Sequence, residues 1–115
     1  AVWLAEMVKK KAKKAGFDWP DISGALDKLS EELEELKTAV AQGTNVEEEL
    51  GDLLFSAVNV SRFLKADPEV ALGKATDKFI SRFAKVEALA AAQNQAMEGM
   101  TLEELDKLWE RAKET

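Results

Sequence analysis

The amino-acid sequence predicts an all-α protein, a bundle of four main helices plus a short C-terminal helix. Only two prolines occur in 115 residues, and no stretch sustains the alternation of apolar and polar residues that is typical of strands. Glycines and capping residues divide the chain into segments of helical length. A chain of this length has room for one domain, so we expect residues 1–115 to form a single domain.

Glycines and capping signals mark the first three expected helices. The first covers roughly residues 2–15 and stops at Gly16, after which a loop carries two aromatic residues. The second is expected over residues 23–42, with leucines on one face and Gly43 at its end. Thr44-Asn45-Val46-Glu47 matches a capping box, which opens a third helix that reaches about residue 65.

The last two helices begin at similar signals. Asp67-Pro68 places a favoured N-cap residue before a first-turn proline, so a fourth helix is expected from there to about residue 94. Gly99 interrupts the chain, and Thr101-Leu102-Glu103-Glu104 matches a second capping box, which predicts a short final helix.

The third expected helix is apolar almost all the way round. Such a helix lies at the centre of a fold or is covered by a second subunit, and a bundle this small buries limited surface. We therefore expect a dimer or a higher oligomer. The apolar residues are Leu50, Leu53, Leu54, Phe55, Ala57, Val58, Val60, Phe63 and Leu64.

The residue types that the chain lacks restrict its chemistry. Histidine and cysteine are both absent, which excludes disulfides, Cys/His zinc sites, cysteine nucleophiles and histidine bases. The net charge of −6 disfavours an extended nucleic-acid interface. No apolar run approaches the ~20 residues that cross a bilayer, and the lysine-rich first residues lack the apolar core of a secretory signal. We expect a cytoplasmic protein.

Two carboxylates fall on an apolar face of the third helix. At about 100° per residue, Glu49 and Asp52 share a face with Val60 and Phe63. Asp52 is also the one charged residue within the stretch 51–60. A buried carboxylate is costly unless it is paired, protonated or bound to a metal. The alternative for Asp52 is a buried side chain that accepts ordinary hydrogen bonds.

The second helix repeats this arrangement. Glu32 and Glu35 are three residues apart and flank the leucine face, whereas Glu31 and Glu34 turn toward solvent. The short connection makes the two helices antiparallel neighbours, so the acidic pairs can converge, and they would repel strongly without cations. Oxygen ligands without histidine exclude the Glu-x-x-His type of di-iron site and favour Mg²⁺, with Mn²⁺ as an alternative.

Basic and aromatic residues could bind the rest of a phosphorylated ligand, because protein-bound Mg²⁺ commonly takes ligands from substrate phosphates. Lys78 and Arg82 lie four residues apart on the fourth helix, although an ordinary surface pair explains them equally well. Lys10 is a weaker candidate of the same kind. Trp109 is either a core anchor, which the pattern favours, or a platform on which a base stacks.

The acidic residues form a motif. Glu31-Glu32-Leu33-Glu34-Glu35, then residues 36–48, then Glu49-Leu50-Gly51-Asp52 read as EExxE…ExxD. Together with the blocks at residues 16–20, 58–62 and 78–83, in this order, the motif resembles that of the MazG-type nucleoside triphosphate pyrophosphohydrolases, within the all-α NTP pyrophosphatase superfamily. The resemblance is to the C-terminal domain of the two-domain bacterial members and covers nearly the whole chain.

This resemblance implies an enzyme that converts a nucleoside or deoxynucleoside triphosphate and water into a monophosphate and pyrophosphate, as nucleotide-pool house-cleaning. It also implies a homodimer or homotetramer. The implied Mg²⁺-binding and catalytic residues are Glu32, Glu35, Glu49 and Asp52, and the implied supporting acids are Glu31 and Glu48. The implied substrate contacts are Lys78, Arg82 and Trp109.

The sequence also departs from the family pattern. Asn45 stands where a lysine is common, and Thr76 stands where an amide is usual. No metal ligand is lost, so these departures bear on substrate preference and turnover. Two alternatives remain open at this point: a pyrophosphohydrolase restricted to one nucleotide such as dUTP or dCTP, and a non-catalytic helical module that binds nucleotide or metal.

Overall fold

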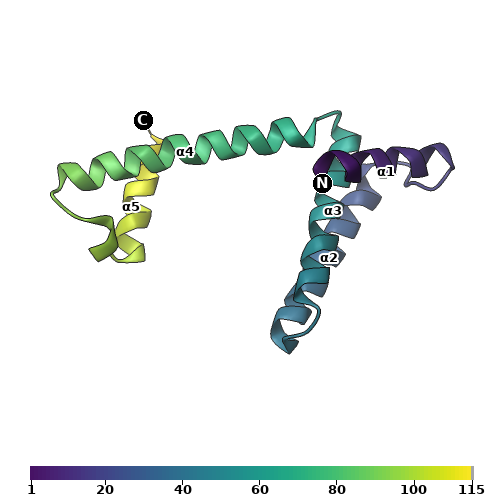
Figure 1. Cartoon of the computed structure of the whole chain (residues 1–115), viewed down its shortest axis with the longest axis horizontal. Helices are drawn as coiled ribbons and strands as arrows, with labels where there is room; N and C mark the ends of the chain where they lie inside the picture. Colours follow the sequence, from purple (N-terminus) through teal and green to yellow (C-terminus); the bar gives the residue numbers. More distant parts are fainter. Residues whose placement is uncertain (115) are drawn as a thin grey trace. The chain divides into compact units, whose positions relative to one another are not determined.

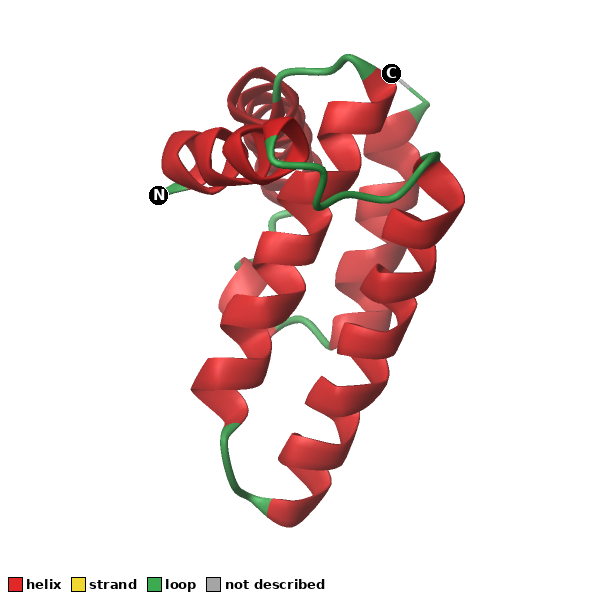
Figure 2. Ribbon diagram, turned by 90° about the vertical axis from the view of Figure 1, so that its right-hand side faces the viewer, coloured by secondary structure: helices red, strands yellow, loops and turns green. Residues whose placement is uncertain are grey.

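The computed structural model describes residues 1–114, which contain helices and connecting loops but no strand (Figures 1 and 2). The all-α prediction is therefore confirmed, as is the order of the helices. The elements are α1 (Val2–Lys14), α2 (Ile22–Gln42), α3 (Val46–Leu64), α4 (Pro68–Ala92), a 3-10 turn (Met97–Gly99) and α5 (Leu102–Lys113). In this described part of the chain, no helix is both long enough and apolar enough to span a membrane.

The helices fall into two compact units that divide within α4, between Ala71 and Leu72. In the first unit, α2 and α3 lie side by side as an antiparallel pair, and α1 crosses the C-terminal half of α3 (Figure 1). Small side chains let the helices approach closely: Ala25 and Ala39 of α2 and Ser56 of α3 are all buried. The acidic residues of α2 and α3 therefore face one another across a narrow seam.

The connection between α2 and α3 is tight because its backbone turns through left-handed conformations. Gly43 has φ of +70° and Asn45 has φ of +57°. The capping box predicted at Thr44 is wrong: Asn45 holds the N-cap position of α3, and its side chain makes no capping hydrogen bond. The left-handed conformation of Asn45 replaces the extended N-cap backbone that a capping box requires.

The other predicted caps are present. Asp67 Oδ1 accepts hydrogen bonds from the backbone N–H groups of Glu69 and Val70, at 2.9 Å and 3.4 Å. The box that opens α5 is complete, because Glu104 N–H donates to Thr101 Oγ1 and Thr101 N–H donates to Glu104 Oε1, both at 3.1 Å. Each cap satisfies backbone donors that the first helical turn leaves free.

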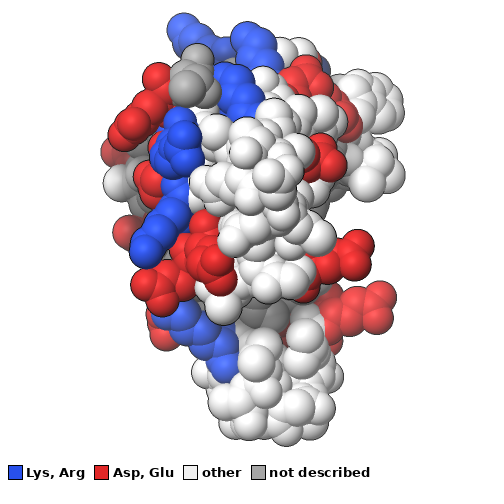
Figure 3. Space-filling model, turned by 90° about the vertical axis from the view of Figure 1, so that its left-hand side faces the viewer, with Lys and Arg blue, Asp and Glu red and all other residues white. Residues whose placement is uncertain are grey.

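The second unit contains residues 72–92 of α4 together with α5. Its core is a cluster of four buried side chains, and Trp109 packs against this cluster with part of its surface exposed. The cluster consists of Val86, Ala90, Leu108 and Ala112. Figure 3 shows the side on which α5 lies, where acidic and basic side chains are interspersed along one border beside a broad uncharged area.

A buried ion pair ties the loop between α1 and α2 to α3. Arg62 donates from its two terminal nitrogens to the two carboxylate oxygens of Asp18, at 2.9 Å and 3.2 Å. Its Nε donates to Asn59 Oδ1 at 2.6 Å. The exposed fractions of the Arg62 and Asp18 side chains are 6% and 9%. The hydrogen bonds from Arg62 hold the pKa of Asp18 below its ordinary value of 3.8, against the opposing effect of burial.

We expect Asp18→Asn to lower the free energy of unfolding at pH 7 by about 2–3 kcal/mol, because it leaves the Arg62 charge buried without its counter-ion. A carboxyl whose pKa is lowered by folding stabilises the protein above its unfolded pKa, and this stabilisation is lost as the pH falls through the folded pKa. The difference between variant and wild type should therefore shrink below about pH 4. Urea unfolding at pH 7 and pH 3 measures both values, and an equal difference at the two pH values would contradict the ion-pair explanation.

Candidate metal centre

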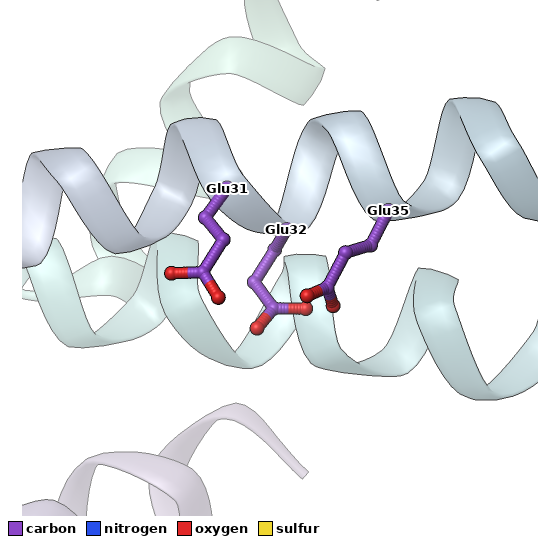
Figure 4. A group of neighbouring side chains, drawn as sticks. All are labelled: Glu31, Glu32 and Glu35. Carbon is purple, nitrogen blue, oxygen red and sulfur yellow. The ribbon is translucent and has the colours of Figure 1, made fainter.

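Three carboxylates project from one side of α2. Glu31 and Glu32 are consecutive, and Glu35 follows one turn later, so one carboxylate oxygen of each lies within 4.8 Å of the others (Figure 4). Glu32 is the central member and is 5% exposed, whereas Glu31 and Glu35 are exposed. Glu32 therefore carries its charge into the seam between the helices.

The facing helix, α3, adds two more carboxylates. One oxygen each of Glu32, Glu49 and Asp52 also lie within 4.8 Å of one another, so Glu32 belongs to both groups. The predicted convergence of the two acidic pairs is thus present in the fold. Glu31, the supporting acid of the motif, is exposed as the helical wheel predicts and also lies in the α2 group.

The burial expected for Asp52 is wrong. Asp52 is exposed, whereas Glu49 is partly buried. Asn59 lies seven residues further along the same face of α3 and is buried beside Arg62. The exposure of Asp52 therefore depends on its position along the helix and not on its face. Glu32 and Glu49, rather than Asp52, are the carboxylates whose buried oxygens are costly without a counter-charge.

Two carboxylate oxygens in the seam are buried and have no hydrogen-bond partner among residues 1–114. They are Oε2 of Glu32 and Oε2 of Glu49, from opposite helices. Leaving a buried charged acceptor unsatisfied is strongly unfavourable. All the available ligand atoms are oxygens, which suits a hard divalent cation such as Mg²⁺ or Mn²⁺ better than zinc or copper. The donor set and its unsatisfied atoms therefore fit a metal centre at this seam.

The proximity of these carboxylates changes their proton affinity. The negative charge of Glu32 raises the pKa of Glu35 above its ordinary value of 4.5, and some desolvation and the charges of Glu49 and Glu31 act in the same direction. A raised pKa is the expected result when carboxylates share a site without enough positive charge. The raised pKa of Glu35 therefore reflects the mutual repulsion of the carboxylates in the cluster.

Lys28 is a basic neighbour of the cluster that the acidic motif does not include. Its Nζ lies 3.0 Å from Glu32 Oε1 and 3.4 Å from Glu31 Oε1. The hydrogen bond to Glu32 is the main reason that the pKa of Lys28 lies above its ordinary value of 10.5. The contact with Glu31 adds to this increase, and partial desolvation opposes it. The available signal was the spacing, because Lys28 precedes Glu31 and Glu32 by three and four residues on the same helix.

An open cavity of about 530 Å³ adjoins the acidic seam. Glu31, Glu35 and Glu49 line it, together with polar residues that include Thr38 and Asn45. Glu48, predicted as a supporting acid, is exposed and lies outside both carboxylate groups. It lines a different depression with Glu47. The cavity at the seam therefore adjoins the candidate metal centre along Glu31, Glu35 and Glu49.

The predicted substrate contacts lie in several places. Lys10 forms an ion pair with Glu6 at 3.2 Å and lines a separate cavity of the first unit. In the second unit, the Arg82 guanidinium lies 6.0 Å from the centre of the Trp109 ring, and Phe79 contacts the same ring. Lys78 is an exposed residue of α4. The core position favoured for Trp109 is present, while the substrate roles of these four residues stay predictions.

Comparison with known proteins gives a family match. Residues 22–87 match the MazG nucleotide pyrophosphohydrolase domain, a range that contains all the acidic residues of the candidate centre. The chain is 49% identical over 113 residues to the nucleoside triphosphate pyrophosphohydrolase/pyrophosphatase MazG of Thermotoga maritima, covering 98% of this chain and 44% of that protein.

Two further relatives show the same pattern. The nucleoside triphosphate pyrophosphohydrolase of Escherichia coli K12 is 38% identical over 117 residues, again covering 98% of this chain and 44% of that protein. The uncharacterized protein YabN of Bacillus subtilis is 48% identical over 71 residues, covering 62% of this chain and 14% of that protein. The chain thus spans less than half the length of the curated relatives that it matches.

We expect Mg²⁺ to raise the melting temperature of the protein. At about 100 times the dissociation constant, binding adds about 2.7 kcal/mol of stability, which corresponds to roughly 10 °C for a chain of this size. Differential scanning fluorimetry measures the shift. Because protons compete with the metal for carboxylates, and the pKa of Glu35 is raised, the shift should already weaken as the pH falls toward 5.

The matched variants are Glu49→Gln and Glu87→Gln, which make the same change in charge. Glu49 belongs to the carboxylate cluster, whereas Glu87 is an exposed residue of α4 outside both carboxylate groups and outside the lining of the cavity at the seam. The thermal shift should disappear in Glu49→Gln and persist in Glu87→Gln. A shift of equal size in both variants would place the cation elsewhere.

Proposed function

Because the chain belongs to the MazG nucleotide pyrophosphohydrolase domain family, we propose that it hydrolyses nucleoside and deoxynucleoside triphosphates to monophosphates and pyrophosphate. The observation that carries this proposal is the pair of unsatisfied carboxylate oxygens of Glu32 and Glu49 in a cluster of five acids. A site that concentrates negative charge beside an open cavity needs a cation, and a cation bound there can receive the oxygens of a triphosphate.

Glu32, Glu35, Glu49 and Asp52 would hold Mg²⁺, with Mn²⁺ as a substitute. When bound, the cation supplies charge neutralisation for the triphosphate and lowers the pKa of an attacking water. Glu32 and Glu49 would offer it the buried oxygens of the seam, and the exposed Asp52 would complete the set from α3. Glu35, which is exposed at the edge of the α2 group, would also orient a water or accept its proton.

The remaining acids and bases would position the substrate. Glu31 would support the metal ligands from the edge of the cluster. Glu48, which lies outside both carboxylate groups, would be a more distant supporting acid that orients a water. Lys78 and Arg82 would hold phosphate oxygens through charge-assisted hydrogen bonds. Trp109 would contact the nucleotide, and Lys10 remains a weaker candidate for a phosphate contact.

We further propose that residues 1–115 act as one domain, and that the protein works as a homodimer or homotetramer in cytoplasmic nucleotide-pool house-cleaning. Support for self-association comes from large apolar side chains that lie exposed on α3: the exposed fractions of Leu50, Leu54 and Leu64 are 45%, 59% and 61%. Several exposed apolar side chains on one helix are typical of a surface that a partner covers.

The test of activity is pyrophosphate release from a panel of nucleoside triphosphates with and without Mg²⁺. Removing one carboxylate ligand should lower turnover by about 100-fold or more, equivalent to about 2.7 kcal/mol of transition-state stabilisation. We therefore expect this loss in Glu49→Ala and Asp52→Ala, and near-wild-type turnover in Glu87→Gln, a change at an exposed position of α4. No pyrophosphate from the wild type on any substrate, or full activity in both ligand variants, would overturn the proposal.

Self-association has its own test. We expect the wild type to sediment as at least two chains, and Leu54→Lys to shift the equilibrium toward the monomer because it places a charge in the apolar contact. Leu102→Lys is the control, since Leu102 is 75% exposed on α5 and receives the same substitution. A monomeric wild type in sedimentation equilibrium would contradict the proposed assembly.

A further inference from the structure

The first unit has a second cavity, of about 460 Å³, beside the loop that joins α1 to α2. We propose that it is a nucleobase subsite, in which a base stacks against Trp19 and Phe17 while the triphosphate reaches the acidic cluster. This inference rests on the proposed function and adds to it a base-binding surface. The residues that line the cavity are Lys9, Gly16, Phe17, Asp18, Trp19 and Lys28.

The cavity adjoins the candidate metal centre through Lys28. This residue lines the cavity, and its Nζ lies 3.0 Å from Glu32 Oε1 and 3.4 Å from Glu31 Oε1. A ligand in the cavity therefore meets aromatic rings at one end and the carboxylate cluster beyond Lys28 at the other. A nucleoside triphosphate carries its groups in the matching order: a planar base, which can stack on the aromatic rings, is followed by an anionic triphosphate, which needs cations.

Trp19 is fixed in place by a glycine. The ring lies so close to α2 at Gly24 that a Cβ atom there would be 2.3 Å from Trp19 Cδ1. Any other residue at this position would have to displace the indole. The helix is thus shaped to accept the ring, which is how a stacking surface is held ready without a large loss of entropy on binding.

Two further contacts hold the same loop. Asp18, the residue before Trp19, is clamped to Arg62 by the buried ion pair. On the other side, Lys9 Nζ lies 5.1 Å from the centre of the Trp19 ring and 5.9 Å from that of Phe55. The indole is therefore held from three elements, while it remains only partly buried.

Phe17 completes the aromatic part of the lining. Its side chain is 76% exposed, and among the described residues it has no recorded ring contact. An exposed ring beside a fixed indole is typical of surfaces on which bases stack, because every base offers a π face. The charges of the lining are already engaged: Asp18 by Arg62, Lys28 by Glu31 and Glu32, and Lys9 over the Trp19 ring. The aromatic faces are therefore its main means of holding a base. Such a lining tolerates different bases.

The experiment separates binding of the base from binding of the phosphates. Steady-state kinetics give the KM for a nucleoside triphosphate, and competition gives the inhibition constant of inorganic tripolyphosphate, which has no base. We expect Trp19→Leu, Phe17→Ala and Gly24→Ala to raise the KM by about 5- to 100-fold. The inhibition constant of tripolyphosphate should stay within about twofold of the wild type. Trp3→Leu, at a 64% exposed position of α1, should leave both values unchanged.

Each failure has a distinct signature. A wild type that hydrolyses no nucleoside triphosphate overturns the proposed function and this subsite together. A wild type that is active, with variants that keep its KM or lose affinity for tripolyphosphate to the same degree, overturns the subsite alone. If Trp19→Leu fails to fold by circular dichroism, Phe17→Ala decides the matter, since removal of a largely exposed ring leaves the core intact.

Discussion

The burial of one charged group, the Glu32 carboxylate, is the constraint on which the first unit depends. The α2–α3 pair packs through small side chains such as Ala25, Ala39 and Ser56, so little space separates Glu32 from Glu49. Opposite charge comes from Lys28, which reaches one oxygen of Glu32 and leaves the other unsatisfied. A seam of this kind has too little positive charge of its own, and that deficit makes it suited to a cation and an anionic ligand.

The rest of the first unit surrounds this seam with two different linings. On one side, the acids and Thr38 line an open polar cavity. On the other, Lys28 joins the loop aromatics, which Gly24 and the Asp18–Arg62 pair hold in place. The two cavities differ in chemistry but share the segment of α2 that contains Lys28 and Glu31 as a border. Binding of phosphate and binding of a ring system can therefore be tuned by separate substitutions.

Much of this could be predicted from the sequence, because it depends on local spacing. Helix order, the Asp67 and Thr101 caps, the family and the convergence of the Glu32 and Glu49 groups all follow from periodicity and motifs. The exposure of Asp52 could not be predicted, since a wheel gives the direction of a side chain but not which positions along the helix are covered by other elements: Asn59, on the same face, is buried. The close contact between the Trp19 ring and Gly24 could not be predicted either, because it depends on the path of the loop between α1 and α2.

The Asp18–Arg62 pair has a consequence for the order in which the site assembles. It joins residues 44 positions apart in the chain, whereas the acidic groups of α2 and α3 meet across a short turn. Contacts that close a long loop carry a larger entropic cost and form later than local ones. On this basis the carboxylate seam is an early product of folding, and the aromatic cavity appears only when the loop closes on α3. The mutually repelling carboxylates of α2 and α3 are thus brought together before the aromatic cavity that would bind a base has formed.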